Sequence, residues 1–217
     1  MFPFYFITDP VLDKKTSATE SVMQAIAGGA RLIQYRDKVN SRRVMYENAK
    51  HLREITAQGG ASLIINDQID LALAVSADGA HLGQNDLPIE SARKMLGKNA
   101  IIGISTHTPE EAIAAALKGA DYIGFGPIFK TKTKSDSNPP TGIAPMVQIS
   151  KQVKIPLYAI GGIAQTDLPA IFDAGANGVA AISAVSYDIE ANVREWMMTI
   201  HSLPKFCDSG IWASTEL

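Results

Sequence analysis

Two stretches of this sequence decide its interpretation: Ile64-Ile65-Asn66-Asp67 and, later, Asp78-Gly79-Ala80-His81-Leu82-Gly83-Gln84-Asn85-Asp86. In each of them a short apolar run stops at amide and carboxylate side chains, which is typical of a strand buried on both faces. The apolar segment between them, residues 69–75, is long enough for a short helix. A strand, a helix and a second strand in this order predict two parallel strands joined by a crossover.

Neighbouring parallel strands end at the same edge of a sheet, so we expect Asp67 and Asp86 to face each other. Two carboxylates about 5 Å apart repel by roughly 3 kcal/mol at an effective dielectric constant of about 20. Such a pair is tolerated if one carboxyl holds a proton or if a cation lies between the two. A hard divalent cation, with magnesium as the first candidate, is one interpretation. The other is that each aspartate separately caps the helix that follows it.

Composition and charge limit the class of protein. The chain has 217 residues, of which 46% are hydrophobic, and a formal net charge of −2, which suits one domain and argues against a general nucleic-acid or anionic-membrane surface. No span is long enough to cross a bilayer, and the first apolar residues are predicted as a strand, not a signal peptide. The single Cys207 allows no internal disulfide. We therefore expect a cytoplasmic protein.

The strand-then-helix order repeats along the whole chain, at about 27 residues per unit. The predicted strands are residues 4–8, 31–36, 62–66, 79–82, 101–105, 122–126, 157–160 and 179–182. The predicted helices are residues 18–27, 41–57, 69–75, 88–96, 108–118, 143–152, 166–174 and 189–201. A doubly wound sheet would carry a glycine fingerprint after its first strand, and Asp9-Pro10-Val11-Leu12-Asp13 contains no glycine. We predict an α/β fold, a single (β/α)8 TIM barrel over residues 1–202, with 203–217 as an unassigned tail.

Unusual polar residues gather where such a barrel does its chemistry, at the carboxyl ends of its strands. Lys130-Thr131-Lys132-Thr133-Lys134 follows the sixth strand and offers charged and neutral donors to a phosphate. Gly161-Gly162 and Ser183 follow the seventh and eighth strands, where backbone N–H groups often bind phosphate. A solvated loop in the first case and a tight turn in the second are the structural alternatives.

The histidines give a weaker signal. We expect His81 to pack or to form hydrogen bonds inside the barrel, and His51 and His201 to lie on the outer surface. His107 lies nearer to the predicted site. No Ser-His-Asp or Cys-His arrangement and no cluster with zinc-ligand spacing can be read from the sequence.

Taken together, seven segments resemble the thiamine-phosphate synthase family. They are Gln34-Tyr35-Arg36-Asp37-Lys38, Ile65-Asn66-Asp67, Asp78 to Asp86, Gly103-Ile104-Ser105-Thr106-His107, Gly126 to Lys134, Ile160-Gly161-Gly162-Ile163 and Ile182-Ser183. The resemblance implies a (β/α)8 barrel that joins 4-amino-2-methyl-5-hydroxymethylpyrimidine diphosphate to 4-methyl-5-(2-phosphoethyl)thiazole, or to its carboxylated form, and releases pyrophosphate. Its partners would be these small molecules, with no nucleic acid and no membrane. The oligomeric state stays open, a homo-oligomer included.

The resemblance also implies roles for individual residues. The pyrimidine diphosphate would be held by Gln34, Tyr35, Arg36, Asp37, Lys38, Asn66, Ser105 and Lys134, with Arg36, Lys38, Ser105 and Lys134 as the catalytic set. The thiazole phosphate would be held by Thr131, Lys132, Thr133, Gly162, Ile182 and Ser183. Asp67 and Asp86 would bind Mg²⁺.

That residue set suits a reaction in which a diphosphate leaves a methylene carbon and a cation remains on the pyrimidine. Such a reaction needs positive charge around the leaving group, and no nucleophile. A thiazole tautomerase is one rival, but it would not need Asp67, Asp86 or Lys134. A non-catalytic regulatory barrel that binds thiamine precursors is another, and it has no use for charge aimed at a leaving group. Another phosphate-sugar isomerase on this fold is the third, and it would need a placed general base.

Overall fold

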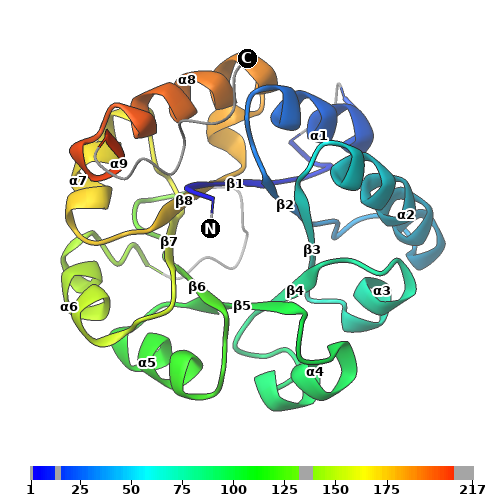
Figure 1. Ribbon diagram of the computed structural model, residues 1–217, viewed down its shortest axis with the longest axis horizontal. Coiled ribbons are helices and arrows are strands. Elements are labelled where there is room, and N and C mark those ends of the chain that lie inside the picture. Colours follow the sequence, from blue (N-terminus) through cyan, green and yellow to red (C-terminus); the bar gives the residue numbers. More distant parts are fainter. Residues whose placement is uncertain (1, 13–15, 132–138, 208–217) are drawn as a thin grey trace.

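In the computed structural model, eight parallel strands close into a barrel surrounded by helices (Figure 1). The structure describes residues 2–12, 16–131 and 139–207. The strands are β1 (Phe4–Ile7), β2 (Leu32–Tyr35), β3 (Ser62–Asn66), β4 (Gly79–Leu82), β5 (Ile101–Thr106), β6 (Tyr122–Phe125), β7 (Leu157–Ile160) and β8 (Gly178–Ala181). They pair in sequence order, and β8 closes onto β1. The predicted (β/α)8 barrel is confirmed.

The helices follow the predicted order. They are α1 (Ala18–Ala27), α2 (Arg42–Gln58), α3 (Ile69–Ala74), α4 (Ile89–Leu96), α5 (Pro109–Leu117), α6 (Ala144–Gln152), α7 (Leu168–Asp173), α8 (Ile189–His201) and α9 (Pro204–Cys207), with 3-10 turns at Gln165–Asp167 and Ser183–Val185. The predicted helix 166–174 therefore begins as a 3-10 turn. Part of the unassigned tail forms α9, and residues 208–217 lie outside the described residues.

Alternating side chains on each strand divide the core into two layers. One set packs between the strands and the helices, and the other fills the inside of the barrel, where Tyr5, Tyr122 and Tyr158 form an aromatic cluster. A Cβ on Gly103 would lie 2.0 Å from the ring of Tyr122, so this strand position needs glycine. The barrel below the site is therefore a packed core and not a pore.

The amino ends of three strands, β4, β6 and β8, share a local motif. The residue just before β4, β6 and β8 is Asp78, Asp121 or Asn177, and its side-chain oxygen accepts a backbone N–H from the preceding strand. The bonds are Leu63 N to Asp78 (2.7 Å), Ile102 N to Asp121 (2.7 Å) and Leu157 N to Asn177 (3.0 Å). Arg53 and Arg93 also pair with the two aspartates, at 2.8 and 2.5 Å. These contacts tie neighbouring strands together at the face opposite the predicted site.

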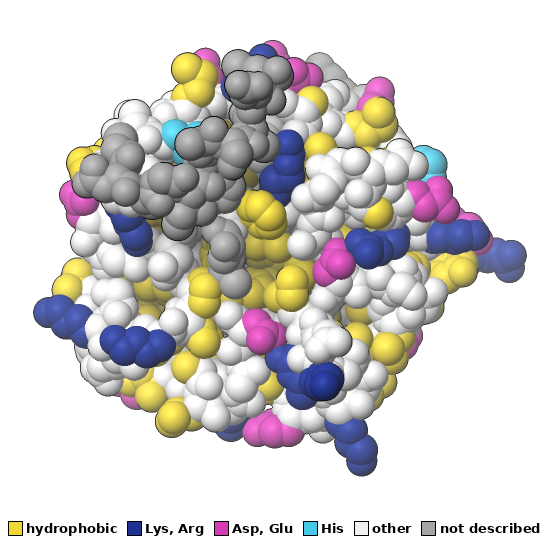
Figure 2. Space-filling model, in the orientation of Figure 1, with side chains coloured by type: hydrophobic (Ala, Val, Ile, Leu, Met, Phe, Trp, Pro, Cys, Tyr) yellow, Lys and Arg dark blue, Asp and Glu magenta, His cyan; other side chains and the backbone are white. Residues whose placement is uncertain are grey.

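The face drawn in Figure 2 has hydrophobic side chains near its middle and charged side chains of both signs toward its edge. None of the helices in the described ranges is long and apolar enough to cross a membrane.

Candidate active site

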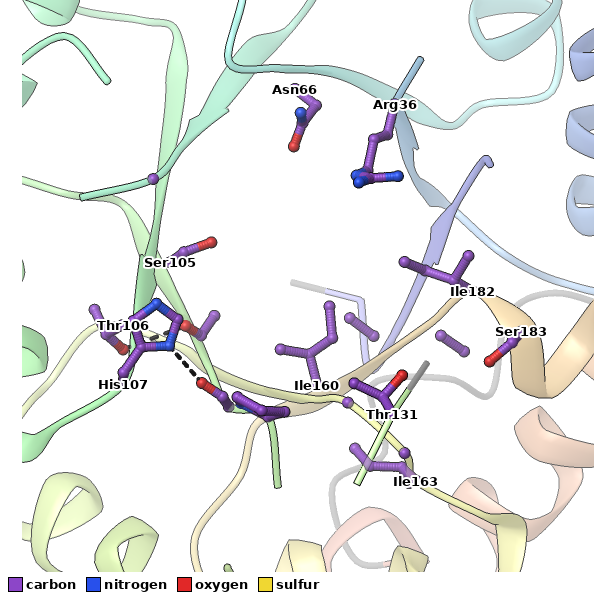
Figure 3. A pocket seen from close by; sticks show the side chains of 18 of the residues that line it. Arg36, Asn66, Ser105, Thr106, His107, Thr131, Ile160, Ile163, Ile182 and Ser183 are labelled. Carbon is purple, nitrogen blue, oxygen red and sulfur yellow. Dashed lines mark hydrogen bonds between the residues drawn. The ribbon is translucent and has the colours of Figure 1, made fainter. Parts of the chain in front are cut away.

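A cavity of about 490 Å³ opens at the carboxyl ends of the strands (Figure 3). It brings together most of the residues that the sequence singled out. Those that line it are Arg36, Lys38, Asn66, Asp67, Asp86, Ser105, Thr131, Gly162, Ile182 and Ser183. Figure 3 shows Arg36 and Asn66 on one side of the cavity and Thr131, Ile163 and Ser183 across from them.

Three predicted residues lie elsewhere. Gln34 lines a narrow extension between the cavity and the barrel interior. Tyr35 and Asp37 are outside the lining of the cavity: both are buried, and the Tyr35 hydroxyl donates to Asp37 at 3.0 Å. The physical reason is strand alternation, because Gln34 and Arg36 point into the barrel and Tyr35 points toward the helices. The structure therefore does not bring Tyr35 and Asp37 into the cavity. They brace the loop after β2, and their predicted contact with the ligand stays a prediction.

Asp37 does this through four hydrogen bonds. Besides the Tyr35 hydroxyl it accepts the backbone N–H groups of Val39 and Asn40, both at 3.0 Å, and the side-chain amide of Asn40 at 2.8 Å. Burial raises the pKa of Asp37, but the bonds from Asn40, Val39 and Tyr35 outweigh it and leave that pKa below its usual value. The loop that presents Lys38 is thereby held by an ionised carboxylate.

Lys132, Thr133 and Lys134 lie outside the described residues. Their predicted contacts with the two substrates stay predictions.

Asp67 and Asp86 face each other at the mouth of the cavity. Burial raises the pKa of Asp86, a hydrogen bond from Gly83 N opposes this, and the charge of Asp67 raises that pKa further. Lys38 forms an ion pair with Asp67. The capping interpretation is wrong, because the residues at the cap positions of α3 and α4 are Gln68 and Pro88.

The backbone conformation of Asp67 also indicates a functional site. Its φ of +59° places a residue other than glycine in the left-handed region. Such residues cost roughly 1–2 kcal/mol and are often found at functional sites. The chain therefore accepts both strain and like-charge repulsion at this edge of the barrel.

The donor set suits a magnesium ion. Mg²⁺ is usually bound by one or two carboxylates, with water and substrate phosphate oxygens as its other ligands. In the described part of the chain, no cluster of three or more His, Cys, Asp or Glu side chains could enclose an ion by itself. Two facing aspartates beside an open cavity match a site that a phosphate-bearing substrate completes.

Arg36 has a partner that sequence reasoning missed. Its Nη1 donates to Asp9 Oδ2 at 2.6 Å, and Asp9, which follows β1, is 3% exposed. The Thr8 hydroxyl accepts the backbone N–H of Arg36 at 3.0 Å. Because β1 and β2 are neighbours, an aspartate just past β1 is placed to hold a cation just past β2. The adjacency of the first two strands could therefore have predicted the contact between Asp9 and Arg36.

The opposite side of the cavity is built from backbone. Phe129 N donates to Gly161 O at 2.9 Å, so the loop after β6 stays paired with the loop after β7. Gly162 has a φ of +66°, and a Cβ there would lie 2.6 Å from the carbonyl oxygen of Lys130. Glycine is required by this close approach, as the tight-turn alternative expects, and the binding role of Gly162 stays a prediction.

The histidines lie largely where they were expected. His81 forms hydrogen bonds inside the barrel, as predicted, and His51 and His201 are exposed on helices. His107 lines the cavity, but its Nδ1 donates to Gly126 O at 2.6 Å and its backbone N–H donates to Glu111 at 2.6 Å (Figure 3). These bonds give His107 a structural task between the loops after β5 and β6.

Known proteins resemble this chain over most of its length. The model of the thiamine monophosphate synthase family matches residues 4–185. A thiamine-phosphate synthase of Chloroflexus aurantiacus is 45% identical over 193 residues, which cover 88% of this chain and 89% of the relative. One from Methanospirillum hungatei is 44% identical over 201 residues, with 91% and 98% covered. The solved thiamine phosphate pyrophosphorylase of Pyrococcus furiosus superposes with a TM-score of 0.83 at 40% identity and covers 91% of this chain and 95% of its own. The chain that carries this cavity belongs to the thiamine-phosphate synthase family.

Proposed function

We propose that the chain joins 4-amino-2-methyl-5-hydroxymethylpyrimidine diphosphate to 4-methyl-5-(2-phosphoethyl)thiazole, or to its carboxylated form, by a dissociative substitution. The bond between the methylene carbon and the diphosphate breaks first, and the exocyclic amine of the pyrimidine spreads the positive charge that remains. The thiazole nitrogen then bonds to the methylene carbon. The products are thiamine phosphate and pyrophosphate.

One observation carries the proposal: among the described residues, the charged side chains that line the cavity gather on a single side of it. Arg36 and Lys38 follow β2, and Asp67 and Asp86 follow the adjacent strands β3 and β4. Arg36 keeps its orientation through Asp9, and Lys38 keeps its place through Asp67. Positive charge fixed before the reaction stabilises a departing anion without reorganisation.

Asp67 and Asp86 would hold magnesium between them. When bound, the ion would neutralise negative charge on the diphosphate. Asp67 would also keep Lys38 near the leaving group, because Lys38 pairs with Asp67. Lys134, which the family resemblance adds to this set, would supply a further cation from the loop after β6.

The side of the cavity on which no described residue is charged, called the uncharged side below, suits the second substrate. Ser183 lies across the cavity from Arg36, and Gly162 and Ile182 also line the cavity. Backbone N–H groups and a hydroxyl can hold the phosphate of the thiazole, while Ile182 offers an apolar contact to its ring. Holding the thiazole nitrogen in line with the methylene carbon, and keeping water out, protects the cation from hydrolysis.

The direct test is to mix both substrates with magnesium and to assay for thiamine phosphate and pyrophosphate. We expect the two products in equal amounts. An electron-withdrawing substituent on the pyrimidine should slow the reaction steeply if a cation forms. A rate that does not change with the substituent would indicate direct displacement in place of the dissociative path. Release of pyrophosphate without thiamine phosphate would contradict the proposed joining of the two substrates.

A further inference from the structure

Two cations follow strand β2, and they are held in different ways. The side chains of Arg36 and its partner Asp9 are 13% and 4% exposed, so this ion pair is shielded from water. Lys38 pairs with Asp67, but the side chain of Lys38 is 54% exposed. A long lysine side chain in water can rotate away from its partner, whereas Arg36 would have to leave a buried carboxylate uncompensated. The site therefore has one fixed cation and one movable cation.

The backbone that carries Lys38 does not need to move with it. Asp37 accepts the backbone N–H groups of Val39 and Asn40, both at 3.0 Å, so the residues on the two sides of Lys38 are tied together. Only the side chain of Lys38 has to change its partner. An exposed side chain rotates within picoseconds to nanoseconds, so it can follow the binding of a ligand without delay.

Asp67 cannot hold Lys38 and a metal ion at the same time without cost. The ammonium group of Lys38 lies against Oδ2 of Asp67. Its charge also reaches Asp86: burial and Asp67 raise the pKa of Asp86, whereas the N–H of Gly83 and the charge of Lys38 lower it. A divalent cation bound by the same two carboxylates would face this ammonium group at close range, where like charges repel. Metal and lysine therefore compete for one pair of aspartates.

We propose that Lys38 takes the place of the metal in the metal-free chain, and that it is released toward the diphosphate when Asp67 and Asp86 bind magnesium. The proposal rests on the proposed function, in which these two aspartates hold the metal. Until then, Asp67 keeps the ammonium group beside the site and partly withholds it from an anion. Release gives the diphosphate a second cation beside Arg36. Metal and diphosphate then strengthen each other's binding, by the same factor in both directions.

The test replaces Lys38 and measures the binding of magnesium and of inorganic pyrophosphate by calorimetry, without turnover. In Lys38→Gln, magnesium alone should bind about two- to fivefold more tightly than in the wild type, because no ammonium group competes for Asp67. Pyrophosphate with saturating magnesium should bind at least about tenfold more weakly, because a hydrogen bond between charged groups is lost. Pyrophosphate with a chelator should bind almost as in the wild type, because Asp67 already engages Lys38 there.

Arg42→Gln is the matched control. Arg42 pairs with Asp70, its side chain is 54% exposed like that of Lys38, and this pair also joins the segment after β2 to the segment after β3. Each variant loses one positive charge, but neither Arg42 nor Asp70 lines the cavity. Arg42→Gln should leave all three affinities at their wild-type values. An equal gain in magnesium affinity in both variants would overturn the proposal, because the overall charge of the chain would then explain it.

An equal loss of pyrophosphate affinity with and without magnesium also overturns the proposal, since Lys38 would then be open to the anion at all times. So does a magnesium affinity that stays constant or falls in Lys38→Gln. Where magnesium alone binds too weakly to be measured in either chain, the two pyrophosphate affinities decide. The melting temperature in chelator checks that each variant folds. A wild-type chain that binds no magnesium even with pyrophosphate would instead contradict the metal role in the proposed function.

Discussion

Aspartates stand beside the strands at both ends of this barrel, but their surroundings differ. At the amino end, Asp78 and Asp121 each accept a backbone N–H and pair with an arginine. At the carboxyl end, Asp67 and Asp86 face each other, and the pKa of Asp86 is raised by its burial and by Asp67. The carboxylates at the amino end join neighbouring strands, whereas the two at the carboxyl end lie next to each other.

The difference separates stability from chemistry. A carboxylate with an arginine and an N–H as partners stabilises the fold, whereas two adjacent carboxylates destabilise it unless a cation or a proton is shared. In barrels of this class the carboxyl ends of the strands carry the active site and the amino ends carry stability. Substitutions at the two ends should therefore change different measured quantities.

The largest effect is expected at Asp86. Asp86→Asn keeps an acceptor for Gly83 N but removes a negative charge, so magnesium binding should weaken and kcat should fall at least about 100-fold, which is about 2.7 kcal/mol. The melting temperature without magnesium should stay the same or rise, since repulsion with Asp67 is gone. Steady-state kinetics over a magnesium titration and thermal unfolding measure the two. Unchanged turnover would remove the metal role.

The next effect concerns the cation on the same side of the cavity. Asp9→Asn leaves Arg36 charged but replaces its ionic partner with a neutral amide, so the guanidinium should lose its fixed orientation. Removal of such a supporting partner typically costs about 10–100-fold in activity. We expect kcat/KM for the pyrimidine diphosphate to fall within that range while KM for the thiazole phosphate stays constant. An equal rise in both KM values would mean that the whole cavity, not Arg36, had changed.

How much of the fold and of the candidate site could be predicted from the sequence depends on whether a feature is set by neighbouring residues or by distant strands. Asp67 and Asp86 were predicted to face each other because their strands are adjacent and parallel, and this needs only the order of the strands. Tyr35 was grouped with the cavity residues because the run from Gln34 to Lys38 was taken as one unit, but alternation along the strand directs Tyr35 toward the helices. The hydrogen bonds that join Tyr5 to Tyr122 and Tyr122 to His81 depend on which inward side chains meet across the barrel. That follows from the stagger of the strands, which no local sequence pattern encodes.

A smaller effect is expected on the uncharged side. Gly162→Ala combines an unfavourable φ with a Cβ 2.6 Å from Lys130 O, so the loops after β6 and β7 must separate. We expect KM for the thiazole phosphate to rise about tenfold, or about 1.4 kcal/mol, with little change for the pyrimidine diphosphate. Gly60→Ala is the matched control, because Gly60 has a φ of +62° with nothing within 4 Å. It should lower stability by roughly 1–2 kcal/mol through backbone strain and leave both KM values unchanged. A similar rise in KM in both variants would reduce the role of Gly162 to strain alone.

The smallest effect is expected at the amino end. Asp121→Asn keeps an oxygen for Ile102 N, and Asn177 already makes the equivalent bond to Leu157 N, so the strand link survives and only the ion pair with Arg93 is lost. Because Asp121 is 42% exposed, that pair should contribute no more than about 1 kcal/mol, which corresponds to about 2–4 °C in melting temperature for a chain of this size. Kinetic constants should be those of the wild type. If Asp121→Asn lowered kcat as Asp86→Asn does, the two ends of the barrel would not divide stability from chemistry. If instead its melting temperature fell by far more than about 4 °C, the hydrogen bond to Ile102 N would depend on the ion pair with Arg93. The equivalent bond of Asn177 to Leu157 N forms without a charge.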